Sequence, residues 1–164
     1  MRTKAKNLSY LKPKLKLAKV PPLLTFKASK VQSNLSEVLD ELDNWCDDGR
    51  LICVRSSTGD EDGILSAKAG EYESVLDIES NNSKKITNAF KVVLESISRK
   101  RKVTELDEIF VQEMVCDVDM SGVLFTRELN SGSPYYVVNY DDQTKQTHTV
   151  TSGNEKSIRV LNVF

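Results

Sequence analysis

Two basic residues of the chain could contact phosphate. Arg55 follows the apolar run Leu51–Val54, and Lys4 lies near the N-terminus. A planar, permanently charged guanidinium can hold two phosphate oxygens at once, and a lysine ammonium neutralises phosphate from a flexible stem. Taken alone, each residue is more simply an ordinary surface charge, and Arg55 could pair with the acidic run 60–62. The two residues therefore allow a phosphate site without establishing one.

Other kinds of catalytic site have little material in this sequence. The three cysteines, Cys46, Cys53 and Cys116, lack the C-x-x-C spacing of a zinc or redox site. We interpret them as small packing residues in a reducing cytoplasm. The single histidine, His148, stands in a threonine-rich segment that we expect to be a solvated strand. We therefore predict no metal site among these residues and no histidine-based triad.

Helical spacing of apolar residues predicts two amphipathic helices that support these positions. Apolar residues recur at this spacing over residues 35–46 and again over residues 86–97. Asn34 is placed to cap the first helix, with Glu37 as the capping-box acid, and Gly49 is placed to end it. A third, short helix is expected within residues 1–19, broken near Pro13, because a proline ring clashes with the preceding helical turn.

The remaining regular structure is predicted to be β. Residues 109–115 and 122–126 are rich in β-branched residues and flank the polar segment 117–121, which predicts a hairpin. Trp45 is expected to pack in the core rather than to stack on a nucleotide. Further strands are expected at residues 20–27, 51–54, 73–78, 135–140, 146–151 and 158–164.

Length and composition indicate a globular protein of one domain or two small lobes. The chain has 164 residues, with 39% hydrophobic and 29% charged residues. No apolar run approaches the roughly 20 residues of a membrane span, so we predict no membrane segment, and we recognise no signal peptide. A mild boundary near residues 98–104 predicts an N-terminal α+β lobe, residues 1–102, and a mainly antiparallel β lobe, residues 103–164.

Charge is distributed unevenly along the chain. The first 36 residues contain nine Lys or Arg and no acid, whereas residues 37–79 contain thirteen acids. Such asymmetry can indicate a basic arm that binds nucleic acid. The basic segment also carries several leucines and the pair Pro21-Pro22, so we expect it to fold. Its charges fit phosphate or the acidic segment equally well, and we predict no nucleic-acid partner.

Two motifs, taken in order, resemble one family of enzymes. The sequence VRSSTGDED at residues 54–62 and the sequence VQEMV…SGVLFTR at residues 111–127 are similar to the nucleotide-binding domain of pyruvate phosphate dikinase and phosphoenolpyruvate synthase. This family of ATP-grasp phosphotransferases also includes rifampin phosphotransferase and glutamine kinase. The similarity extends more weakly over most of the chain. It implies an α+β, ATP-grasp-like fold and the ATP-binding portion of a phosphotransferase, or kinase.

The resemblance also implies roles for single residues at the phosphates. Lys4 falls on the lysine of the family's opening glycine-glycine-lysine motif, although Arg2-Thr3 replaces the two glycines. Arg55 falls on the phosphate-binding arginine, so Lys4 and Arg55 are the expected catalytic residues. Gly70 and Ser74 fall in the loop that lies over the phosphates, where a glycine lets backbone amides approach an anion closely.

The second motif is expected to bind adenine. The amide of Gln112 is expected to hydrogen-bond the edge of the base, and Met114 to form an adaptable apolar wall. Backbone groups of Glu113 and Val115 are expected to read the donor–acceptor pair of the base. Arg127, at the end of the motif, completes the expected nucleotide site.

Part of the family's machinery is not found before Phe164. ATP-grasp chemistry needs Mg²⁺, and the family's metal ligands lie on later strands, so we expect them beyond this chain. We expect an N-terminal portion of a longer cytoplasmic kinase, incomplete as a fold and inactive alone, whose other domains and small-molecule acceptor are not identified. The alternative is a non-catalytic α+β binding module without a nucleotide site. The two differ in whether four residues converge on one cleft: Lys4, Arg55, Gly70 and Gln112.

Overall fold

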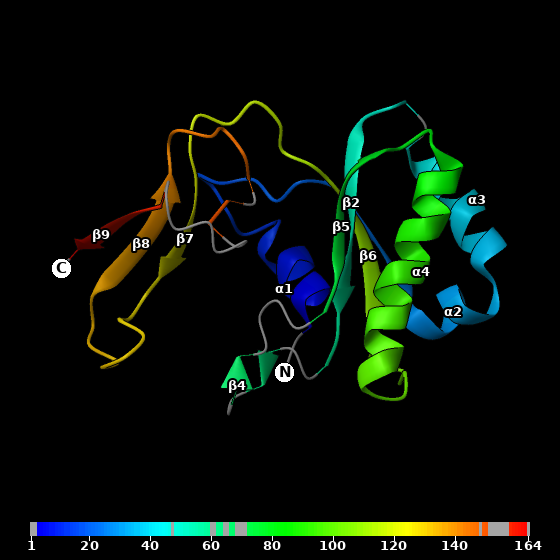
Figure 1. Ribbon diagram of the computed structural model, residues 1–164, viewed down its shortest axis with the longest axis horizontal. Helices are drawn as coiled ribbons and strands as arrows, with labels where there is room; N and C mark the ends of the chain where they lie inside the picture. Colours follow the sequence, from blue (N-terminus) through cyan, green and yellow to red (C-terminus); the bar gives the residue numbers. More distant parts are fainter. Residues whose placement is uncertain are drawn as a thin grey trace. The chain divides into compact units, whose positions relative to one another are not determined.

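The chain folds into two compact units, Met1–Met114 and Val115–Phe164. The computed structural model describes residues 3–46, 48–59, 62–63, 66–67, 72–147, 149–150 and 158–163. The predicted α+β class is confirmed, because helices and antiparallel sheets both occur in it (Figure 1).

A four-stranded antiparallel sheet forms the centre of the first unit. Its strand order is β1-β6-β2-β5. β6 comes last in sequence but lies between β1 and β2, with Phe110 in register with Thr25 on one side and Arg55 on the other. The strands are β1 (Leu23–Lys27), β2 (Leu51–Ser57), β5 (Ser74–Glu79) and β6 (Glu108–Glu113), and a separate two-stranded ribbon is formed by β3 (Asp62–Gly63) and β4 (Ser66–Ala67).

Three helices cover one face of this sheet, as Figure 1 shows. They are α2 (Ala28–Ser33), α3 (Leu35–Trp45) and α4 (Ser83–Lys100). The apolar stripes predicted for α3 and α4 are buried as expected, and Phe90 of α4 meets Phe26 of β1 edge-to-face, with ring centroids 5.8 Å apart. The core between helices and sheet is made by residues that include Val38, Leu42, Ile52, Val54, Ile78, Ile86, Phe90, Val93, Ile97, Ile109 and Val111.

The ends of α3 follow the prediction at one side only. The side chain of Asn34 accepts a hydrogen bond from the backbone N–H of Glu37, as predicted for an N-cap. The helix ends at Trp45, which packs against the edge of the core. Gly49 lies beyond that end, with φ +80°, and its N–H donates to Ser80 Oγ at 3.0 Å. Gly49 therefore shapes the turn into β2 rather than ending the helix.

The helix α1 (Lys4–Leu11) lies on the opposite face of the sheet from the other three (Figure 1). It ends before Pro13, as predicted. Its single buried residue is Ala5, and Tyr10 and Leu11 are each 41% exposed. Little apolar surface therefore attaches α1 to the sheet.

The second unit contains a three-stranded antiparallel sheet in the order β7-β8-β9. The predicted strand over residues 146–151 is wrong for its described part, because residue 147 is in a bend, residues 149–150 are in a turn and residue 146 has no regular structure. The strands are β7 (Ser121–Phe125), β8 (Tyr136–Asp141) and β9 (Arg159–Val163).

The predicted hairpin between residues 109–115 and 122–126 is wrong. β6 pairs with β1 and β2, whereas β7 pairs with β8. β6 is buried along nearly its whole length. A strand in the middle of a sheet, with a neighbour on each side and covered faces, is buried more completely than one strand of an isolated hairpin. Because β6 pairs with strands of the first sheet, it belongs to the first unit, which ends at Met114. The boundary predicted from the sequence lies between residues 102 and 103.

A loop after β7 is organised by the carboxylate of Glu128. It accepts hydrogen bonds from the backbone N–H of Asn130 at 3.0 Å and of Ser131 at 2.6 Å, and from Ser131 Oγ at 2.7 Å. The backbone N–H groups of Asn130 and Ser131, with the Ser131 hydroxyl, lower the pKa of Glu128 to about 2. This carboxylate therefore favours the closed loop only in its ionised form.

We expect the carboxyl group of Glu128 to titrate near pH 2, below the ordinary value of about 4.3. Because the folded pKa is depressed, its contribution to stability is present above about pH 4 and is lost as the pH falls towards 2. The measurement is a carbon-detected NMR titration of the side chain. Ser131→Ala removes one donor and should raise this pKa; a wild-type midpoint near 4.3 would contradict the loop geometry.

Candidate functional site

The face of the first sheet that carries α1 differs chemically from the face that carries the other helices. Ile52 and Val54 point into the core. Since side chains alternate along a strand, Arg55 points to the opposite face. Its cross-strand neighbours Ser74, in β5, and Phe110, in β6, share that face. Two predicted site residues, Arg55 and Ser74, are thus brought side by side.

The guanidinium of Arg55 lies near an aromatic ring, and its Nε has no hydrogen-bond partner among the described residues. Its central carbon lies 5.9 Å from the centroid of Phe110. Among the described residues, two buried polar atoms near the end of β2 have no hydrogen-bond partner, Arg55 Nε and Thr58 Oγ1. An unsatisfied buried polar group costs about 1–3 kcal/mol, and native proteins rarely retain one without a use for it. Arg55 Nε is therefore suited to donate to an anionic ligand.

The first turn of α1 is hydrogen-bonded to the same end of β2. The backbone N–H of Ala5 donates to Ser57 Oγ at 2.9 Å. Ser57 is two residues after Arg55 and therefore points to the same face. Lys4 precedes Ala5, so the structure places both predicted catalytic residues, Lys4 and Arg55, on one side of the sheet.

Gln112 also lies on this face, two residues after Phe110 in β6. Its side chain is buried, and Nε2 donates to the backbone carbonyl of Pro21 at 3.4 Å. This contact uses one of the two N–H donors of the Gln112 amide.

The residues after Gln112 are engaged within the first unit. The backbone N–H of Glu113 donates to the Pro22 carbonyl at 3.0 Å. Of the two backbone groups of Glu113, the carbonyl is therefore the one left for the predicted contact with adenine. The side chain of Glu113 forms an ion pair with Arg50 at 3.0 Å. Met114 donates through its N–H to Leu51, at 2.9 Å, and its sulfur lies 3.1 Å from the N–H of Asp77.

The structure does not relate the other three predicted site residues, Gly70, Val115 and Arg127, to this face. Gly70 lies outside the described residues. Val115 and Arg127 belong to the second unit. Val115 is 51% exposed, and the guanidinium of Arg127 donates to the carbonyl of Gly132 at 2.9 Å.

Sequence reasoning overlooked three residues of this face: Thr3, Phe110 and Glu108. Phe110 could have been found, because period-two alternation places it on the same side as Gln112. Thr3 and Glu108 form a buried hydrogen bond at 2.8 Å across 105 positions of the chain. No local pattern reports such a contact.

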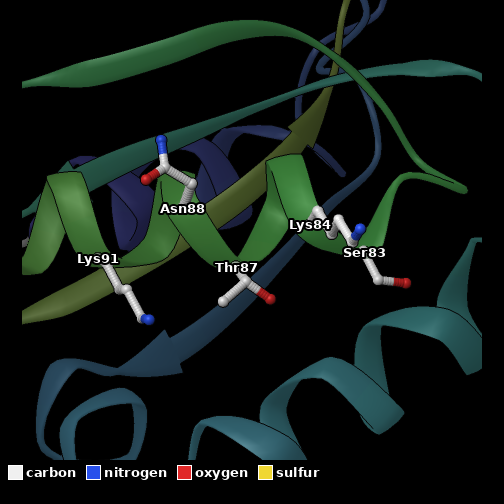
Figure 2. A pocket seen from close by; sticks show the side chains of 5 residues that line it. All are labelled: Ser83, Lys84, Thr87, Asn88 and Lys91. Atoms are coloured by element: carbon white, nitrogen blue, oxygen red, sulfur yellow. The ribbon is translucent and has the colours of Figure 1, made fainter.

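The two depressions described for the first unit lie away from this face. One, of about 320 Å³, is on α4 and is lined by polar side chains, as Figure 2 shows. In that view, Thr87 and Lys91 point to one side of the helix and Asn88 to the other. None of the predicted site residues lines either depression. The linings are Ser83, Lys84, Thr87, Asn88 and Lys91 for the first, and Gln32, Ser98, Arg101, Lys102 and Val103 for the second.

Membrane-spanning helices and metal-binding clusters are both absent from the described residues. No helix in the described ranges is long and apolar enough to cross a membrane. No group of three or more His, Cys, Asp or Glu side chains in the same ranges could hold a metal ion.

Comparison with known proteins identifies the family. A family model described as "Pyruvate phosphate dikinase, AMP/ATP-binding domain" matches residues 23–143. No curated protein matches the chain. The matched residues include Arg55, Ser74 and Gln112, whereas Lys4 precedes them. Because the match covers most of its residues, the chain belongs to the pyruvate phosphate dikinase AMP/ATP-binding domain family, as the resemblance of its two motifs predicted.

Proposed function

We propose that the chain binds ATP on the α1 face of the first sheet, as the nucleotide-binding portion of a phosphotransferase. The supporting observation is Arg55, whose buried Nε has no partner among the described residues although its guanidinium is fixed beside Phe110. A permanently charged fork held in this way is suited to phosphate oxygens. Family membership supports a nucleotide as the ligand. The position of Arg55 supports the α1 face of the sheet as the place where its phosphates bind.

In this proposal each predicted residue has one task. Arg55 and Lys4 hold and neutralise phosphate oxygens, and Gln112 binds the edge of adenine through its amide. Met114 and the carbonyl of Glu113 lie next to the base. From the resemblance we also assign Gly70, Ser74, Val115 and Arg127 to the nucleotide site.

Mg²⁺ and the acceptor complete the proposed reaction from outside this chain. When bound, Mg²⁺ neutralises charge on the transferred phosphoryl group. From the family resemblance, we propose that its ligands lie on later strands, in a longer cytoplasmic enzyme. The acceptor is proposed to be a small molecule bound by other domains of that enzyme. The chain alone is then expected to bind ATP without turnover.

We expect calorimetric titration with ATP, with and without Mg²⁺, to show binding that Lys4→Ala weakens about five- to tenfold. The reason is the loss of one charged contact to phosphate, worth about 1–1.4 kcal/mol. Lys12→Ala is the matched control, because Lys12 stands at the exposed far end of the same helix. Equal affinity of the wild type and the Lys4→Ala variant would remove Lys4 from the site, and no ATP binding by the wild-type chain would favour a non-catalytic binding module.

A further inference from the structure

A buried carboxylate lies beneath the first turn of α1. Glu108 begins β6 in register with Ser57 of β2, so its side chain points to the face that carries Arg55. That side chain is 7% exposed. A buried carboxylate is costly unless hydrogen bonds and opposite charges satisfy it. Its partners therefore show what the structure uses it for.

Two of these partners come from the N-terminal segment. Thr3 Oγ1 donates to Glu108 Oε2 at 2.8 Å, and Lys6 Nζ lies 3.5 Å from Oε1. The third partner, Lys27 Nζ, lies 3.5 Å from Oε1 and also donates to the carbonyl of Glu105 at 2.8 Å. Glu108 thus binds Thr3, the residue before α1, and Lys6, in the first turn of α1, to the central strand β6.

Apolar packing cannot replace these contacts. Ala5 is the one buried residue of α1, and the polar bond from its N–H to Ser57 Oγ is a further attachment of the first turn. The hydroxyl of Thr3 is a group that glycine, which the family has at this position, would not supply. The N-terminal segment of this chain therefore has its own means of docking.

Lys4 lies between the two docked residues, Thr3 and Ala5. Its backbone is therefore fixed on both sides. We propose that Glu108 is a positioning residue for nucleotide binding: it holds the first turn of α1 on the sheet and acts on the phosphates through Lys4. This inference rests on the proposed function for its last step, whereas the docking step is independent of any nucleotide.

The docking step is tested by amide hydrogen exchange without ATP. Glu108→Gln removes the charge that attracts Lys6 and Lys27, and Thr3→Val removes the hydroxyl at almost constant shape. We expect either change to speed exchange of residues 5–11 at least tenfold while α4 is unaffected. Glu41→Gln, which breaks an exposed ion pair with Lys30 at 3.0 Å, is the matched control and should change neither helix. Unchanged protection of α1 in both test variants would overturn the proposal.

The second step is tested by a double-mutant cycle on ATP affinity. If Glu108 acts through Lys4, Lys4→Ala should weaken binding about five- to tenfold in the wild type but less than twofold in the Glu108→Gln background. The Thr3→Val background should give the same result if Glu108→Gln does not fold. Equal losses in all backgrounds would show a merely structural role. If the wild-type chain binds no ATP, the proposed function fails, and hydrogen exchange still decides whether Glu108 docks α1.

Discussion

Replacing Arg55 with alanine is expected to weaken ATP binding about 10- to 100-fold. Hydrogen bonds to charged groups contribute roughly 1.5–3 kcal/mol, and each 1.4 kcal/mol is a factor of ten in affinity. Arg55→Lys should restore little of the loss, because an ammonium keeps the charge but not the planar fork that lies beside Phe110. The measurement is calorimetric titration of both variants with ATP.

The matched control for Arg55 is Arg99→Ala. Arg99 lies on α4 and pairs with Glu95 at 3.1 Å, with its side chain 76% exposed. It should leave ATP affinity unchanged. Since Nε of Arg55 is buried without a partner among the described residues, its removal should lower the free energy of unfolding by no more than about 1 kcal/mol. Undiminished ATP affinity of a folded Arg55→Ala variant would refute the phosphate role.

Replacing Asp107 with asparagine is expected to lower the free energy of unfolding by about 3 kcal/mol. Its side chain is 1% exposed and accepts from both terminal nitrogens of Arg101 at 2.7 Å. It also accepts from the N–H of Thr104 at 2.7 Å and from its hydroxyl at 3.0 Å. Breaking such a pair from one side leaves a partly buried guanidinium without its counter-charge. Urea denaturation of the wild type and the variant gives the difference directly.

The exposed pair Glu95–Arg99 supplies the control for Asp107 as well. Glu95→Gln removes one i,i+4 surface ion pair and should cost less than about 0.5 kcal/mol. A comparable loss in both variants would contradict a special role for Asp107.

The destabilisation of Asp107→Asn should also depend on pH. Burial alone would raise the pKa of Asp107, but Arg101 and Thr104 hold it below its ordinary value. The stability that the carboxylate contributes is therefore present above about pH 4, the ordinary value for aspartate, and is lost as the pH falls further. The difference between wild type and variant should shrink in acid; a constant difference down to pH 2 would contradict this pairing.

The helices were largely predictable because their evidence is local. The apolar spacing of residues 35–46 and 86–97 fixes which side of each helix is buried, and Asn34 marks one start. The helix α2 was missed because its six residues are too few to show a period. The end of α3 was misplaced because Gly49 serves a turn, and a glycine marks either feature equally well in sequence.

The site was predictable only where a motif named its residues. Arg55 and Gln112 were chosen from the two motifs and Ser74 from the loop that resembles the family's phosphate loop, and strand register then placed them on one face. The contact between Thr3 and Glu108 could not be predicted, because it depends on which strands become neighbours. The hairpin prediction failed for the same reason. Alternation identifies residues 109–115 and 122–126 as strands, but it does not identify the strands with which they pair.

The late position of β6 in the sequence has a consequence for synthesis on the ribosome. β1 and β2 are its two neighbours, and both are made earlier, so neither has its full set of partners until residue 113 has left the exit tunnel. During that interval the unpaired backbone N–H and C=O groups along both strands are open to pairing with other nascent chains. Nascent chains arrested before Glu108 should therefore recruit chaperones or aggregate, and those arrested well beyond Glu113 should become protease-resistant.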